Sequence, residues 1–148
     1  MVPFAQHRRS TDPARVRVLI ADDHELIRVG LARLVSAQPE LRVVGTAADG
    51  HEAVALAMSE HPDVVIMDLS MPRLDGVAAT REITRLSPET RVLVLSSYVE
   101  QLIVASAIAA GACGYLFKNV SSFDVIEAIR RAYGGETVFS VDPRTSMT

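Results

Sequence analysis

Carboxylate, hydroxyl and ammonium groups stand at the ends of four short apolar runs in this sequence. They are Asp22 and Asp23, Asp68, Ser96, and Lys118. Clustered carboxylates repel one another, so they need protons or a cation, and an all-oxygen set favours a hard ion such as Mg²⁺. A carboxylate beside such an ion can act as the nucleophile toward a phosphoryl donor, while a lysine pairs with a phosphoryl oxygen and a hydroxyl donates to it. These residue types therefore predict phosphoryl transfer to an aspartate.

Each of these residues also has a plain structural interpretation. The stretch from Asp22 to Glu25 has the pattern of a capping box, in which Asp22 would cap a helix. Asp68 precedes a turn-like segment that contains Pro72, so a solvated turn aspartate is an alternative. For Asp75 we keep the structural interpretation, a helix cap followed by a glycine turn. The chemical interpretation is favoured because four run ends each supply one part of a single site.

The elements that must bring these groups together alternate along the chain. Apolar, β-branched runs predict five strands, at Val16–Ile20, Leu41–Thr46, Val64–Met67, Val92–Leu95 and Gly114–Phe117. Stretches of helical periodicity predict helices at about Glu25–Ala37, Gly50–Ser59, Gly76–Leu86, Val99–Ala109 and Ser122–Tyr133. This alternation is typical of βα units with a parallel sheet. Parallel strands end at one edge, and a right-handed crossover can set the first and third strands side by side.

The composition is that of a single globular domain. The chain has 148 residues, of which 49% are hydrophobic, and its formal net charge is −3. With no global positive field, direct DNA binding by this chain is not expected. The single Cys113 cannot form an internal disulfide, and no apolar run has the length of a signal peptide or of a membrane span. We therefore expect a cytoplasmic protein that does not associate with membranes.

The sequence resembles the receiver domains of bacterial two-component response regulators, most closely the NarL/LuxR-type subgroup. The resemblance runs from about Arg15 to Gly135 and is carried by VLIADDHELIRVGL, VVIMDLSMPRLDG, VLVLSS and GACGYLFK. It implies a flavodoxin-like (βα)5 three-layer sandwich with a five-stranded parallel sheet in the order 2-1-3-4-5. The boundaries expected are a disordered tail at 1–14, the receiver domain at 15–135, and a tail or the start of a linker at 136–148.

The resemblance also assigns roles to individual residues. It implies that Asp68 is the phosphoacceptor, and that Asp22, Asp23 and the Ser70 backbone carbonyl join Asp68 in holding Mg²⁺. It further implies that Ser96 is the switch hydroxyl and that Lys118 is the lysine of the site. Tyr115 would be the aromatic that turns inward on activation. An ordinary half-buried strand aromatic is the alternative for Tyr115.

Two features of the sequence depart from the family pattern. Many receivers have a proline, often on a cis bond, after the lysine, whereas this chain has Asn119, so a cis bond is not expected. The residues that come after the last predicted helix are too few for the DNA-binding domain that this subgroup usually carries. We assign His24 and the other histidines no function.

The expected function is that of a signalling module. It accepts a phosphoryl group from a sensor histidine kinase and then changes its partner contacts, either by forming a homodimer or by docking to another protein. It catalyses only its own phosphorylation and dephosphorylation. Control of transcription through a DNA-binding domain absent from this chain is the leading version, and a stand-alone receiver acting through protein contacts is the alternative.

Two rivals come from other classes. A phosphatase with an aspartyl nucleophile needs a second aspartate two positions after the first, and this chain has Ser70 there. A flavin-binding electron carrier needs an uncharged, hydroxyl-rich loop after the first strand, where this chain has two carboxylates. Both patterns argue for the receiver.

Overall fold

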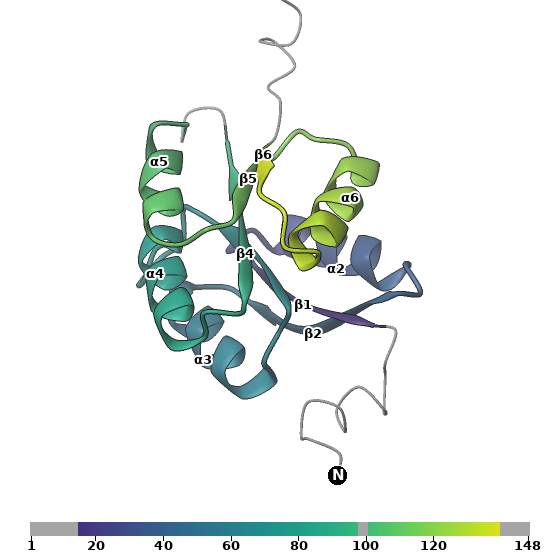
Figure 1. The fold of residues 1–148 in the computed structure, drawn as a ribbon, viewed down its shortest axis with the longest axis horizontal. Coiled ribbons are helices and arrows are strands. Elements are labelled where there is room, and N and C mark those ends of the chain that lie inside the picture. Colours follow the sequence, from purple (N-terminus) through teal and green to yellow (C-terminus); the bar gives the residue numbers. More distant parts are fainter. Residues whose placement is uncertain (1–14, 98–100, 140–148) are drawn as a thin grey trace, which may run out of the picture.

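The computed structural model describes residues 15–97 and 101–139, which form a parallel sheet with helices on both faces (Figure 1). The strands are β1 (Val16–Ala21), β2 (Leu41–Ala47), β3 (Val64–Asp68), β4 (Arg91–Ser96), β5 (Gly114–Phe117) and β6 (Val138–Phe139). The helices are α2 (Glu25–Ser36), α3 (Gly50–Glu60), α4 (Gly76–Leu86), α5 (Gln101–Ala109) and α6 (Ser122–Tyr133). The tail expected at 1–14 lies outside the described residues.

The sheet confirms the predicted topology. Its strands lie in the order β2-β1-β3-β4-β5-β6, and every neighbouring pair is parallel. Each of the five predicted helices is present, although the start expected for α5 at Val99 falls outside the described residues. The α/β fold with the central order 2-1-3-4-5 is therefore as expected, with one strand added at the β5 edge.

That added strand corrects the expectation that the sheet has five strands. Val138 is 3% exposed, and its N–H donates to the Cys113 carbonyl over 3.1 Å. The approach is possible because Gly114 has no side chain: a Cβ there would lie 1.8 Å from the Val138 oxygen. Two residues are too few to show the alternation that predicts a strand. This strand instead depends on a contact with a segment that is distant in the sequence, which the sequence alone does not reveal.

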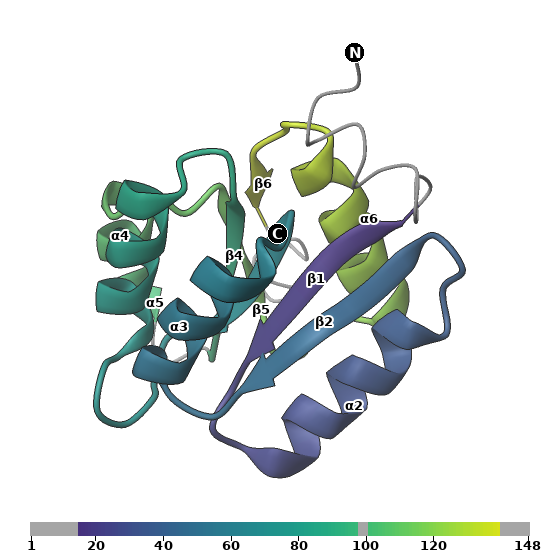
Figure 2. The same cartoon turned by 90° about the horizontal axis from the view of Figure 1, so that it is seen from below.

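The core lies in two layers, one on each face of the sheet. Side chains of β1, β3 and β4 alternate between the faces, as the pleat of a strand requires. Helices α2 and α6 cover one face, and α3, α4 and α5 cover the other (Figures 1 and 2). Among the described residues, no helix combines the length and the apolar character needed to cross a bilayer.

Helix starts and strand ends together define the edge that carries the polar residues. Asp49, Asp75 and Ser121 cap α3, α4 and α6, each by accepting a hydrogen bond from a backbone N–H three residues further on. The structural interpretation of Asp75 is thus confirmed. Strands β3 and β4 run one residue beyond their predicted ends, so Asp68 and Ser96 are the last residues of buried strands.

Candidate functional site

The carboxyl ends of β1 and β3 bring three aspartates and a histidine together. One ligand atom from each of Asp22, Asp23, His24 and Asp68 lies within 4.8 Å of the others. The two strands pair in parallel, so the residues at their ends are neighbours. The structure thus places the three predicted carboxylates in one cluster.

Asp22 is fully buried at the base of this cluster. Its Oδ1 accepts a hydrogen bond from the His24 backbone N–H at 2.8 Å, whereas its Oδ2 has no hydrogen-bond partner among the described residues. Helix α2 begins only at Glu25, and its N-cap residue is His24, which makes no side-chain capping bond. The capping-box alternative for Asp22 is therefore wrong.

Asp68 is also fully buried, and its two oxygens have different surroundings. Its Oδ1 lies 2.9 Å from the Lys118 Nζ and accepts a hydrogen bond from the Ser70 backbone N–H at 3.3 Å. Its Oδ2 is buried without a hydrogen-bond partner in the described part of the chain. The burial of Asp68 excludes the alternative of a solvated turn aspartate. Because Oδ2 has no hydrogen-bond partner among the described residues, it is the oxygen that can react or bind a cation.

The electrostatic environment of Asp68 opposes its negative charge. Burial raises the pKa of Asp68 from its ordinary value of 3.8 to about 6, and the charge of Asp22 adds to this rise, while Lys118 acts against it. At neutral pH the carboxylate is therefore mostly ionised, as a nucleophile must be.

The raised pKa predicts how the stability of the metal-free protein depends on pH. Between pH 3.8 and about 6 the folded state binds more protons at Asp68 than the unfolded state, so this group's contribution to stability falls as pH rises through that window. The full loss amounts to about 3 kcal/mol. Urea unfolding at a series of pH values, on the parent and on Asp68→Asn, should show a free-energy difference that changes across the window and is flat above it. A difference that stays constant across this pH window would contradict the assignment.

The residues at this edge fit a magnesium ion. Buried ionised oxygens without donors are costly, and the Oδ2 atoms of Asp22 and Asp68 are two such oxygens beside the partly exposed Asp23. A hard divalent cation prefers carboxylate, carbonyl and water oxygens, which this edge offers. The chemistry of the donor set therefore matches the predicted cofactor.

His24 is the member of the cluster that sequence reasoning missed. Its Nδ1 lies 3.2 Å from both the Asp22 Oδ1 and the Asp23 Oδ1, and its side chain is largely exposed. Because Mg²⁺ takes oxygen ligands, the ring acts here as a hydrogen-bond partner of Asp22 and lies beside Asp23. The only signal in the sequence was its position directly after the acid pair.

Ser96 is the fully buried last residue of β4, and its hydroxyl forms a hydrogen bond with the neighbouring backbone and not with Asp68. The Oγ donates to the Ser97 backbone carbonyl at 2.8 Å. To bind a phosphoryl group on Asp68, this hydroxyl has to give up that bond. Ser96 thus lies at the end of its strand, and the predicted contact with a phosphoryl group requires a change of side-chain orientation. Its role as the switch hydroxyl stays a prediction.

Tyr115 is half-buried in the middle of β5, as the structural alternative for it expects. Its ring packs edge-on against Phe117, with centroids 5.7 Å apart, and lies 5.5 Å from the ring of Phe139 in β6. The second contact could not be foreseen, because it depends on the unpredicted strand. The switch role of Tyr115 stays a prediction.

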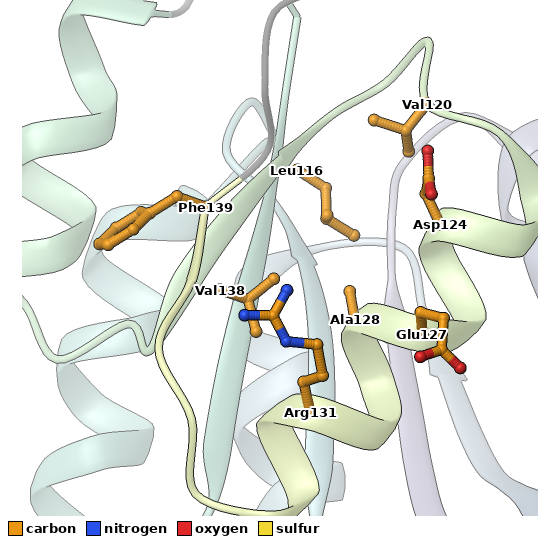
Figure 3. Close-up of a pocket in the computed structure, with 8 residues that line it drawn as sticks. All are labelled: Leu116, Val120, Asp124, Glu127, Ala128, Arg131, Val138 and Phe139. Atoms are coloured by element: carbon orange, nitrogen blue, oxygen red, sulfur yellow. The ribbon is translucent and has the colours of Figure 1, made fainter.

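The bond between Lys118 and Asn119 is trans, as expected from the missing proline. The Lys118 backbone N–H donates to the Ser96 carbonyl at 2.9 Å, which places the lysine at the same sheet edge as the aspartates. A hollow of about 220 Å³ lies elsewhere, between β5, β6 and α6 (Figure 3), and it shares no lining residue with the acid cluster. The acid cluster therefore lies apart from this hollow.

Comparison with known proteins agrees with this geometry. The family model described as the response regulator receiver domain matches residues 18–130. The transcriptional regulatory protein LiaR of Bacillus subtilis is 44% identical over 121 residues, which cover 82% of this chain and 57% of that protein. The response regulator protein VraR of Staphylococcus aureus is 39% identical over 132 residues, covering 89% of this chain and 63% of that protein. The chain thus spans about three fifths of the length of these curated relatives.

A solved structure gives the same result. The signal receiver domain of the response regulator NarL from Mycobacterium tuberculosis superposes with a TM-score of 0.79 at 35% identity, over 84% of this chain and all of that one. The family match covers most of the chain and includes the acid cluster, Ser96 and Lys118. The chain therefore belongs to the response regulator receiver domains of two-component systems.

Proposed function

We propose that this chain accepts a phosphoryl group on Asp68 from a sensor histidine kinase in a reaction that depends on Mg²⁺. The observation that carries the proposal is the state of the Asp68 carboxylate: one oxygen pairs with Lys118, and the other is buried without a partner beside Asp22. A purely structural ion pair between Asp68 and Lys118 does not explain why the Oδ2 atoms of Asp22 and Asp68 are both buried without a hydrogen-bond partner among the described residues. A site for a cation and a phosphoryl group explains both.

The residues of the site have separate tasks. Asp22, Asp23, Asp68 and the Ser70 carbonyl would hold the magnesium, which supplies charge neutralisation between the carboxylates and the incoming phosphoryl group. The ionised Asp68 attacks phosphorus, the new O–P bond forms, and the P–N bond to the kinase imidazole breaks. Lys118 then pairs with a phosphoryl oxygen instead of with the carboxylate. Dephosphorylation by water returns Asp68, so the only reaction catalysed is the protein's own.

The test of this function is intact mass spectrometry after incubation with acetyl phosphate and Mg²⁺. One phosphoryl group should be gained, and none should be gained when the magnesium is chelated. A protein that stays unmodified while its magnesium site is filled would overturn the proposal.

Phosphorylation then has to alter a surface. We propose that the Ser96 hydroxyl turns from the Ser97 carbonyl to the phosphoryl group, and that Tyr115 moves inward, away from Phe139. The surface affected is formed by α5, β5 and the adjoining part of α6. Helix α5 exposes apolar side chains there, with Leu102 93% exposed and Ile103 43% exposed, which suits a partner or a second copy of the chain.

Beryllofluoride, a phosphoryl mimic, tests this coupling. Its binding should change backbone amide exchange in α5 and β5, because a ligand shifts two states only if it discriminates between them. Ser96→Ala should bind the mimic with a reduced response in these elements, since the hydroxyl that links site and surface is gone. If exchange in α5 and β5 is unchanged with the mimic demonstrably bound, the proposed switch is wrong and only a phosphate-binding site remains.

Control of transcription is the proposed output, through a DNA-binding domain outside these 148 residues. It rests on the relatives, since LiaR is a transcriptional regulatory protein by name and both curated relatives are longer than this chain. A receiver that acts only through protein contacts is the alternative. An aspartyl-nucleophile phosphatase is disfavoured because Ser70 occupies the position of the second acid.

A further inference from the structure

The loop between β3 and α4 holds an arginine in a backbone conformation that favours glycine. Arg73 has a φ of 65°, and the Leu74 N–H donates to the Pro72 carbonyl at 2.8 Å, which closes a three-residue turn centred on Arg73. A turn of this kind with positive φ at its centre is rare and strained for a residue that carries a side chain. It persists only where surrounding contacts hold it.

The arginine side chain makes such a contact with the start of α3. Its Nε and Nη2 donate to the Asp49 Oδ2 at 3.0 and 2.7 Å, while the Asp49 Oδ1 accepts from the Glu52 backbone N–H at 2.9 Å. The hydrogen bond from Glu52, together with the smaller effect of the Arg73 guanidinium, holds the pKa of Asp49 below its ordinary value. One carboxylate therefore caps a helix and anchors the loop.

Two close backbone approaches fix the rest of the loop. A Cβ on Gly50 would lie 1.8 Å from the Leu74 oxygen, so the loop rests directly on the first turn of α3. A Cβ on Gly76 would lie 2.1 Å from the Asp68 oxygen, which fixes the other end of the loop against β3. The contact of Arg73 with Asp49 adds a charged pair at the tip of the loop.

We propose that Arg73 is a positioning residue for the magnesium site. The inference rests on the proposed function, because Ser70, whose carbonyl we propose as a ligand, lies in the same loop between Asp68 and Arg73. The Ser70 N–H reaches the Asp68 Oδ1 at 3.3 Å, so loop position also affects the acceptor carboxylate. By holding the strained turn on Asp49, Arg73 keeps Ser70 at the distance from Asp68 that a shared cation requires.

Calorimetric titration with Mg²⁺ alone tests the inference without an activity assay. Arg73→Ala should weaken Mg²⁺ binding by about tenfold, the lower end of the loss expected when groups that hold metal ligands in place are removed. Arg73→Gly should weaken binding equally, although glycine adopts positive φ freely and this variant should be at least as stable to urea as Arg73→Ala. If Arg73→Gly is more stable than Arg73→Ala but binds Mg²⁺ no better, stability and Mg²⁺ binding are separated, which a merely structural role would not give.

Three controls sharpen the test. Arg85→Ala removes an arginine of similar exposure that pairs with Glu82 on α4, and it should leave Mg²⁺ binding unchanged. Asp49→Asn keeps the helix cap but removes the charge that pairs with Arg73, so it should weaken Mg²⁺ binding as much as Arg73→Ala does. The double variant, with both substitutions, should bind Mg²⁺ no more weakly than either single variant.

The possible failures are distinguishable. If the parent and Arg73→Ala bind Mg²⁺ within about twofold of each other while Asp23→Asn binds poorly, the positioning role is wrong and the proposed function stands. If the parent itself binds no Mg²⁺, both are wrong.

Discussion

Replacing Asp68 with asparagine should abolish phosphoryl uptake from acetyl phosphate and leave the fold intact. The amide keeps the size of the side chain and one oxygen for Lys118, but it is not a nucleophile toward phosphorus. Without Mg²⁺ and at neutral pH, the variant should unfold at higher urea concentration than the parent, because a buried negative charge near Asp22 is removed. Intact mass and circular dichroism measure the two effects.

The matched control for this experiment is Asp75→Asn. Asp75 is an exposed acid near the other end of the same loop, and asparagine caps a helix as well as aspartate does. This variant should take up one phosphoryl group as the parent does. Undiminished labelling of Asp68→Asn would place the nucleophile on another residue, and loss of labelling in Asp75→Asn would show that the assay reports loop integrity instead of the acceptor.

The sequence predicted the elements well because their patterns are local. The five long strands are apolar runs, and the helices between them have capping residues such as Asp49, Asp75 and Ser121. The convergence of Asp22, Asp23 and Asp68 could be expected from a general rule about where parallel strands end. These features required no knowledge of any particular long-range contact.

The features that could not be predicted depend on contacts between distant segments. Strand β6 exists because Gly114 leaves room for Val138, and two residues carry no periodicity. The pair Arg73 and Asp49 joins two loops whose separate sequences suggest only a turn and a cap. The orientation of the Ser96 hydroxyl toward Ser97 is likewise a choice among rotamers that residue order does not determine.

Magnesium should stabilise the protein in the absence of phosphate. The cation relieves the repulsion between Asp22 and Asp68 and satisfies their two unpartnered oxygens, and it binds only where the fold brings them together. At a Mg²⁺ concentration about 100 times the dissociation constant, the free energy of unfolding should rise by about 2.7 kcal/mol. Thermal unfolding at constant ionic strength, with KCl replacing MgCl₂, measures the effect without confusing it with screening.

The aspartates of the cluster should differ in how they change this response. Asp22→Asn removes a fully buried charge, so it should raise the stability of the metal-free protein while it weakens the response to Mg²⁺. Asp23→Asn removes a partly exposed charge, so it should weaken the response with little effect on the metal-free protein. Asp124→Asn, in the first turn of α6, should keep the parent's full response. If millimolar Mg²⁺ leaves the melting temperature of the parent unchanged, these carboxylates do not form a metal site. The same conclusion follows if Asp124→Asn loses as much of the response to Mg²⁺ as Asp22→Asn and Asp23→Asn do.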